Sequence, residues 1–384
     1  MTRPKRLITI AHSYVVALNR RLGQEMAKVG QPDWDVHVVA PSFIHGDLRP
    51  IPFEQSPDDP KNISIIKTYC SKSTHVMAYG LALKKILAQG WDIVHAWEEP
   101  YILAGGQIAF WTPKNARLVY SSFQNIPKRY PPPFSCIERY AMRRAAGWVA
   151  FSHSVQAALR NRYAYSGKPS SVITVGVDTD MFRPDSASRV RIRSELGWGI
   201  DGPPVLGFLG RFVEEKGLRL LMQVLDKLPT AWRSLFVGGG PLEPHLRDWA
   251  ARFPDRVRIV TGVPHNRVPA YLNAMDLLVA PSQTTPRWKE QFGRMIIEAF
   301  AVGVPVIGSD SGEIPYVIRD SGLVVAERDT EGWIRALAGM VNSPLMRQHF
   351  RAIGIQRAQD EFSWPVVARK HLQFFGEIMD QKGV

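Results

Sequence analysis

Short apolar runs rich in β-branched residues recur along this sequence, and each is followed by a segment with helical patterning. The runs are nearly continuous rather than alternating, which is typical of parallel strands covered on both faces. They read RLITIAH, DVHVVAP, DIVHAWE, RLVYSSF, GWVAFS and SVITVGV in the first half, and PVLGFLG, RSLFVGGG, VRIVTGV, LLVAPS, PVIGSD and GLVVAE in the second. Alternating strands and helices build βαβ units, so the pattern predicts an α/β protein with two doubly wound sheets of six strands each.

The length of 384 residues also favours two domains, because single cores rarely grow beyond about 250–300 residues. The polar stretch GVDTDMFRPDSASR (176–189) separates the two sets of strands. We therefore predict an amino-terminal domain at 1–183 and a carboxy-terminal domain at 184–361. The remaining segment, 362–384, has apolar residues at helical spacing and is expected to form a closing helix that packs back toward the amino-terminal domain: Val366, Val367, Leu372, Phe375 and Ile378.

Composition excludes several classes of protein. Hydrophobic residues make up 45% and charged residues 22%, as in globular rather than disordered chains. The two cysteines, Cys70 and Cys136, argue against a disulfide scaffold and fit a reducing cytosol. No CxxC or HExxH spacing indicates a metal site. No run approaches 18 apolar residues, and Leu7–Ala11 is too short for a signal peptide, so we expect a cytoplasmic protein, either soluble or peripheral on the inner face of a membrane.

The net charge of +13 favours anionic partners, although a generally basic surface would explain it equally well. No block of Lys and Arg marks a nucleic-acid arm. The densest basic stretch with interleaved aromatic residues is KRYPPPFSCIERYAMRR (128–144), which would suit an anionic membrane surface.

Two doubly wound sheets that face each other would place the carboxyl ends of their strands around one cleft, so candidate residues are sought in the loops after the strands. In GFLGRFVEEKG (207–217), Gly210 permits a tight turn, and Arg211 and Lys216 flank the entry to a helix. This arrangement suits a diphosphate, although the two cations could also be ordinary surface residues of a βα turn. After RSLFVGGG, backbone near Gly239 could approach a ligand closely or form a loose turn before a helix that begins at Pro241.

The stretch KEQFGRMIIEAFAVGVPVIGSDSGE (289–313) contains two carboxylates, at Glu290 and Glu298. The pattern predicts a helix that begins near Gly293 or Arg294, with Glu290 before it and Glu298 about one turn inside. Capping of the helix would explain one glutamate. It does not explain Glu298, whose apolar neighbours make a carboxylate costly unless it has a partner such as sugar hydroxyls.

The first half offers weaker candidates. Glu98 and Glu99, in HAWEEPYI, could bind an acceptor or cap a helix that begins at Pro100. His153 follows the run GWVAFS and could be structural or contact substrate.

Several of these segments resemble one family. EQFGRMIIEAFAVGVPVIGSDSGEIPYVI (290–318) is similar to the E-x7-E signature of retaining glycosyltransferases of family 4, which have the GT-B fold. GRFVEEKG resembles the phosphate loop of that family, and GVDTDMFRP its interdomain linker. DLLVAPS and FSW also match. The resemblance covers most of the chain and is most specific at 203–326.

The resemblance implies transfer of a hexose, with retention and without a metal or other cofactor, from a UDP- or GDP-sugar to a glycan or lipid-linked acceptor in cell-envelope polysaccharide synthesis. Arg211 and Lys216 would neutralise the diphosphate leaving group, Glu298 would hold the ribose and Glu290 the transferred sugar. The rest of the implied donor site comprises Phe292 and Gly293 through backbone N–H groups, Arg294, Gly210, Gly239, and Val263 in the loop TGVPHN near the base.

The sequence departs from the family in two places. The loop after the first run, AHSYVVALNRRL, lacks the usual Gly-Gly pair, and His12, Ser13 and Asn19 would take over its polar contacts. Gln124 stands where many members have a histidine, so we expect it to position substrate rather than transfer protons. Alternative readings are another GT-B enzyme, such as a nucleotide-sugar epimerase or a phosphorylase, or a basic binding protein without catalysis.

Overall fold

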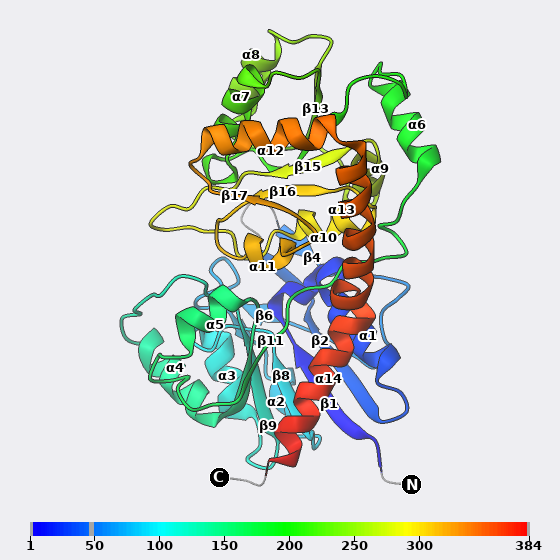
Figure 1. Cartoon of the computed structure of the whole chain (residues 1–384). Coiled ribbons are helices and arrows are strands. Elements are labelled where there is room, and N and C mark those ends of the chain that lie inside the picture. The colour runs from blue at the N-terminus through cyan, green and yellow to red at the C-terminus, as the bar shows by residue number, and fades with distance from the viewer. Residues whose placement is uncertain (1–2, 46–49, 382–384) are drawn as a thin grey trace. The chain divides into compact units, whose positions relative to one another are not determined.

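The computed structural model describes residues 3–45 and 50–381 and divides into two compact units (Figure 1). Unit 1 comprises Met1–Gly176 and Trp364–Val384, and unit 2 comprises Val177–Ser363. The change of unit therefore falls before the 183/184 boundary that the sequence suggested. Val177 belongs to unit 2 because its N–H donates to the carbonyl of Phe362 (2.8 Å) and because it forms a bridge with Ser363.

Unit 1 contains a seven-stranded parallel sheet in the order β11-β10-β9-β8-β1-β2-β5. Its strands are β1 (Lys5–Ile10), β2 (Trp34–Pro41), β5 (Ile63–Ile66), β8 (Ile93–Ala96), β9 (Arg117–Ser122), β10 (Ala145–Ala150) and β11 (Ser170–Val172). All six runs predicted as strands in this half are confirmed. The sequence missed β5, because this edge strand alternates between the exposed Ile65 and the buried Ile66 and so lacks a continuous apolar run.

The other elements of unit 1 are helices and short antiparallel pairs. The helices are α1 (Arg21–Val29), α2 (Ala82–Leu87), α3 (Leu103–Trp111), α4 (Phe134–Arg144), α5 (His153–Leu159) and α14 (Trp364–Asp380), with 3-10 turns η1 (His12–Val15) and η2 (Ala17–Arg20). The antiparallel pairs are β3 (Phe43–His45) with β4 (Pro50–Pro52), and β6 (Thr68–Tyr69) with β7 (Ala78–Tyr79).

Helix α14 packs along α1 within unit 1 (Figure 1). Its residues Val367, Leu372, Phe375 and Ile378 are buried, in agreement with the helical spacing of the sequence. A Cβ atom at Gly147 of β10 would meet Ile378 at 2.6 Å, so the strand needs glycine there for the helix to lie so close.

Unit 2 contains a six-stranded parallel sheet in the order β14-β13-β12-β15-β16-β17. Its strands are β12 (Val205–Arg211), β13 (Arg233–Gly239), β14 (Val257–Val260), β15 (Leu277–Ala280), β16 (Val306–Ser309) and β17 (Gly322–Val325). These are the six runs predicted from the second half of the sequence. Its helices are α6 (Ser186–Glu195), α7 (Leu218–Lys227), α8 (Glu243–Ala250), α9 (Val268–Asn273), α10 (Arg294–Ala301), α11 (Ile314–Ile318), α12 (Thr330–Asn342) and α13 (Pro344–Arg357), with η3 (Glu214–Lys216), η4 (His265–Arg267) and the π-helical turn η5 (Ala358–Phe362).

Helices cover both faces of the unit 2 sheet, as a doubly wound fold requires. On one face, Phe208 and Phe236 share a core with Leu221 of α7, Trp249 of α8 and Trp333 of α12. On the other face, Gly308 of β16 lies against Ile314 and Ile318 of α11.

In both sheets the strand order reverses once. In unit 1 the chain moves outward from β1 through β2 to β5 and then returns to β8, so the reversal lies between β1 and β8. In unit 2 it moves from β12 through β13 to β14 and then returns to β15, so the reversal lies between β12 and β15. Ligands of open α/β sheets bind beyond the carboxyl ends of the strands at such reversals. These two positions are where functional residues should be sought.

Candidate functional site

Lys216 and Glu290 form an ion pair at the strand reversal of unit 2. Lys216 ends the η3 turn that follows β12, and Glu290 lies in the loop that follows β15. The Lys216 Nζ atom lies 2.5 Å from Glu290 Oε2, and the Ser282 hydroxyl donates to the same oxygen at 2.8 Å. The two side chains are only 14% and 8% exposed. Glu290 therefore binds a lysine rather than capping the next helix, and its Oε1 atom forms no hydrogen bond among the described residues.

Arg211 lies at the end of β12 and its side chain is exposed. Within residues 3–45 and 50–381 the structure shows no hydrogen bond or ion pair that occupies its guanidinium. Gly210 and Gly239 lie on paired strands, since Gly210 pairs with Gly238 and Arg211 with Gly239. A Cβ atom at Gly239 would meet nothing within 4 Å, so the backbone is open on that side.

Helix α10 begins at Arg294, as predicted, and Gly293 before it has a φ of 84°. This left-handed conformation favours glycine, and a Cβ atom there would also lie 2.9 Å from Ile296. No side chain of the described residues caps this helix, so its first turn presents backbone N–H groups. Phe292 is buried and packs against Phe362, whereas Arg294 is half-buried.

Glu298 lies one turn inside α10 and is 7% exposed. Nε2 of His265 lies 3.5 Å from Glu298 Oε1, and this buried nitrogen has no hydrogen-bond partner in the part of the chain that the structure describes. Val263 lies two residues earlier in the loop after β14 and is half-buried. A buried carboxylate beside an unsatisfied imidazole suits a ligand with several hydroxyl groups.

His12 and Glu98 form the corresponding pair at the strand reversal of unit 1. The Glu98 carboxylate accepts from the His12 backbone N–H (2.6 Å), lies 2.6 Å from His12 Nδ1 and accepts from the Tyr79 hydroxyl (2.6 Å). Glu98 is 1% exposed. Its negative charge raises the pKa of His12, while burial and Glu98 raise the pKa of Tyr79. The imidazole is thereby oriented and its cationic form is favoured.

The loop after β1 forms two 3-10 turns instead of a glycine turn. Ser13 lies in the first turn and its carbonyl accepts from the Asn19 amide at 3.2 Å. This hydrogen bond joins the two turns of the loop.

Glu99 and Gln124 meet at the ends of β8 and β9. Glu99 accepts from the Phe123 backbone N–H (2.6 Å) and from the Gln124 amide (3.4 Å), while Arg162 donates to the Gln124 carbonyl (3.4 Å). Burial raises the pKa of Glu99 to about 7. The helix-cap interpretation of Glu98 and Glu99 is wrong, because α3 begins only at Leu103 and both carboxylates bind other groups. His153 begins α5 at the end of β10, next along this sheet edge.

Sequence reasoning missed several residues that support these pairs. Thr9 bonds both Tyr14 (2.9 Å) and His95 (3.0 Å), and His95 continues to Ser121 (2.9 Å). Burial lowers the pKa of His95, so this ring is neutral. A histidine in the middle of an apolar strand was the only local signal for this network.

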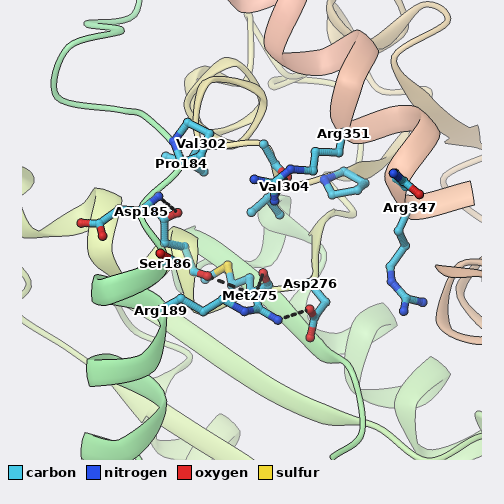
Figure 2. A pocket seen from close by; sticks show the side chains of 14 residues that line it. Pro184, Asp185, Ser186, Arg189, Met275, Asp276, Val302, Val304, Arg347 and Arg351 are labelled. Carbon is cyan, nitrogen blue, oxygen red and sulfur yellow. Dashed lines mark hydrogen bonds and ion pairs between the residues drawn. The ribbon is translucent and has the colours of Figure 1, made fainter. Parts of the chain in front are cut away.

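A pocket of about 560 Å³ in unit 2 is not part of this site (Figure 2). Its lining includes Asp276, directly before β15, and Pro305, directly before β16, so it lies at the amino edge of the sheet. The Arg189 guanidinium contacts Asp276 at 2.6 Å, as Figure 2 shows. The Arg189 cation of this pocket is therefore already paired with a carboxylate.

None of the helices in the described part of the chain has both the length and the apolar character needed to cross a bilayer. Residues 3–45 and 50–381 contain no group of three or more His, Cys, Asp or Glu side chains arranged to hold a metal ion. Cys70 and Cys136 carry free, exposed thiols.

Comparison with known proteins adds information on family. Residues 15–181 match the model described as Glycosyltransferase Family 4, and residues 203–343 match Glycosyl transferases group 1. A GDP-mannose-dependent alpha-(1-6)-phosphatidylinositol monomannoside mannosyltransferase of Mycolicibacterium smegmatis is 30% identical over 59% of this chain and 62% of its own length. A 2-deoxystreptamine glucosyltransferase of Streptomyces kanamyceticus is 30% identical over 49% of each chain. The matched part thus spans about half to three fifths of these relatives.

Solved structures share the fold at low identity. A glycosyltransferase from Rickettsia africae superposes with a TM-score of 0.76 at 18% identity, over 99% of this chain and 100% of the other. Anabaena HepE in complex with UDP superposes with a TM-score of 0.70 at 16% identity, over 97% and 100%.

Proposed function

This chain belongs to the family 4 glycosyltransferases on the GT-B fold, and from that premise we propose that it moves a sugar from a nucleoside diphosphate donor to a glycan or lipid-linked acceptor. The observation that carries the proposal is the Lys216–Glu290 pair at the strand reversal of unit 2, with Glu298 buried one turn inside the adjoining helix. This is the edge of the sheet where such folds bind ligands.

The diphosphate is assigned to the cations after β12. Departure of a nucleoside diphosphate places negative charge on phosphate oxygens, and fixed positive charge there lowers the barrier. Lys216 is held in place by Glu290, and Arg211 has its five donors available among the described residues. We infer that these two residues act where a metal ion acts in other transferases, so the reaction needs no metal. The N–H groups at the start of α10, beside Phe292, Gly293 and Arg294, would add further donors.

The two glutamates are assigned to hydroxyl groups of the donor. Glu290 Oε2 is occupied by Lys216 and Ser282, which leaves Oε1 to accept from the transferred sugar. Glu298 would accept from the ribose, and the loop with Val263 and His265 would lie near the base. Among similar proteins, one relative is named as GDP-mannose-dependent and one structural neighbour holds UDP, so both bases belong in a test.

The carboxyl edge of the unit 1 sheet is assigned to the acceptor. His12, oriented by Glu98, would hydrogen-bond an acceptor hydroxyl through Nε2, and Gln124 would position substrate. Ser13, Asn19 and His153 follow strands at the same edge. One relative is named a 2-deoxystreptamine glucosyltransferase and another a phosphatidylinositol monomannoside mannosyltransferase, and these names support a polyhydroxy or lipid-linked acceptor in the cell envelope. Retention of configuration, with the leaving phosphate accepting the acceptor proton, and action at the inner face of a membrane complete the proposal.

A donor panel tests the function. The purified chain is incubated with UDP- and GDP-sugars, with and without magnesium, and thermal shifts and donor hydrolysis are recorded, since ligands that bind the folded state raise its melting temperature. We expect one donor to stabilise the protein without magnesium, and Arg211→Ala and Glu298→Gln to abolish the shift. Arg335→Ala, an exposed residue of α12, is the matched control and should retain it. Stabilisation by no donor, or equal loss in the control, would refute the assignment.

A further inference from the structure

A second pocket of unit 1 lies at the amino edge of its sheet, opposite His12 and Glu98. It has a volume of about 530 Å³. Its lining includes Arg117, the first residue of β9, and Ala145, the first residue of β10, together with the end of α4 and the turn before β11. This size admits a small phosphorylated compound or a lipid headgroup. The reaction proposed above uses none of these residues.

The charge of this pocket is of one sign. Among residues 3–45 and 50–381, five cationic side chains and no carboxylate line it: Lys114, Arg117, Arg143, Arg144 and Lys168. The pocket of unit 2 in Figure 2 differs, because Asp185 and Asp276 belong to its lining and Asp276 pairs with Arg189. Like charges gathered around one cavity repel one another unless an anion occupies it.

Neutral groups orient three of the cations without neutralising them. Arg144 donates to the carbonyl of Thr112 (2.9 Å), Lys168 to that of Ala145 (2.7 Å) and Arg117 to that of Gln381 (3.2 Å). Burial lowers the pKa of Lys168, so its ammonium is partly desolvated. A bound anion would supply the counter-charge that these carbonyls lack.

The other two cations are exposed. For Lys114 and Arg143 the structure shows no ion pair or hydrogen bond within the described residues. Arg143 and Arg144 also end α4, where cations complement the helix dipole. That role explains two of the five charges but not those of Lys114, Arg117 and Lys168, which come from other segments.

The backbone leaves room beside these side chains. The pairing of β10 with β9 shifts register between Ala145 and Gly147, so Ala146, which lines the pocket, is a bulge residue. Bulges are over-represented near functional sites. Gly167 has a φ of 73°, and a Cβ atom there would meet nothing within 4 Å. The turn at 166–168 is therefore open toward solvent rather than packed.

We propose that this pocket binds a phosphate group, carried by a ligand other than the sugar donor. A phosphate offers several oxygen acceptors and about two negative charges, which match a cluster of lysine and arginine donors without carboxylates. The phosphate belongs either to a soluble compound or to a lipid headgroup. The site lies at the amino edge of the unit 1 sheet, whereas the acceptor is proposed to bind at the carboxyl edge. The proposal therefore does not depend on glycosyl transfer.

The test measures binding of inorganic phosphate to the full chain by calorimetry at constant ionic strength. An Arg211→Ala background removes binding at the proposed donor site. Arg143→Glu changes the pocket, and Arg139→Glu is the matched control, because Arg139 is exposed one turn earlier on the same helix and does not line the pocket. Lys114→Glu is a second variant, from a different segment, which guards against a folding defect in the first.

We expect the two pocket variants to weaken phosphate binding at least tenfold and Arg139→Glu to change it less than twofold. Equal weakening in all three variants would show a diffuse effect of surface charge and overturn the proposal, as would the absence of phosphate binding in the background protein. Vesicles with and without phosphatidic acid distinguish the sources. If the protein floats with the phosphatidic acid vesicles, and Arg143→Glu or free phosphate prevents this, the ligand is a lipid headgroup. If the protein binds phosphate but does not float with the vesicles, the ligand is a soluble compound.

Discussion

Removal of the Lys216 ammonium should destabilise unit 2 by an amount that depends on whether Glu290 keeps its charge. The Nζ and Oε2 atoms are 2.5 Å apart and both side chains are largely buried. At an effective dielectric constant of about 20 their attraction is about 7 kcal/mol, most of which offsets the desolvation of the two ions. The net value of the pair is therefore small, but a lone buried carboxylate is costly.

We expect Lys216→Met to cost about 2–4 kcal/mol of unfolding free energy. Breaking a buried pair costs about 3–5 kcal/mol, and the Ser282 hydroxyl, which still donates to Glu290 at 2.8 Å, reduces this. Loss of the contact between Nζ and the Trp288 ring, at 5.3 Å, adds about 0.5–1 kcal/mol. In the double variant with Glu290→Gln no buried charge is left unpaired, so we expect it to be more stable than Lys216→Met alone by about 1–2 kcal/mol.

Hydrogen exchange of peptides from 277–301 is the suitable assay, because a chain with two units need not unfold in one transition. Binding of the nucleotide sugar is measured on the same samples. If the pair also holds the donor, the double variant recovers stability but not binding. Additive losses of stability in the two single variants would refute the reasoning, since independent residues show no coupling.

Three further predictions concern single sites. Glu98→Gln should lower the pKa of His12 toward its ordinary value in an NMR titration, and an unchanged titration would contradict the contact. Because Glu98 raises the pKa of His12 in the folded state, this pair stabilises the fold below pH 6.5, and the stabilisation is lost as the pH rises through the raised pKa. The pKa of Glu99 is about 7 in the folded state against an ordinary 4.5, so the unfolded chain releases this proton first and the unfolding free energy should fall by up to about 3 kcal/mol as the pH rises from 4.5 to about 7. Urea titrations measure this fall, and a Glu99→Gln variant that still shows it would be evidence against the assignment to Glu99. Gly293→Ala should lower the free energy of thermal unfolding by about 1–2 kcal/mol because the φ of Gly293 is positive, whereas Gly339→Ala inside α12, where a Cβ atom meets nothing within 4 Å, should raise it by about 0.5–1 kcal/mol. Changes in stability of the same sign in both variants would exclude the backbone explanation.

The strands were predictable because their signal is local. A parallel strand covered on both faces needs a continuous apolar run, and twelve such runs became twelve strands. The apolar pattern did not predict strand β5, because its edge position exposes Ile65 and so interrupts the apolar run. The start of α10 was also predictable, since Gly293 precedes an apolar helical pattern.

Other local signals were misleading. Pro100 suggested a helix start, and the two acidic residues before it suggested capping, but α3 begins at Leu103. Glu98 and Glu99 instead bind His12 and the Phe123 backbone N–H. Their partners lie 86 and 24 residues away, so no local pattern could indicate them.

The sequence by itself determined the fold class and supplied the polar residues that follow the strands, because periodicity and loop chemistry are encoded within a few positions. Only the tertiary structure decided which of these residues meet. Lys216 and Glu290 are 74 residues apart, yet they pair because β12 and β15 are neighbours at a reversal of strand order. His12 and Glu98 pair for the same reason beside β1 and β8. Strand order is a property of the whole sheet, and it brings together side chains that neighbours in sequence cannot specify.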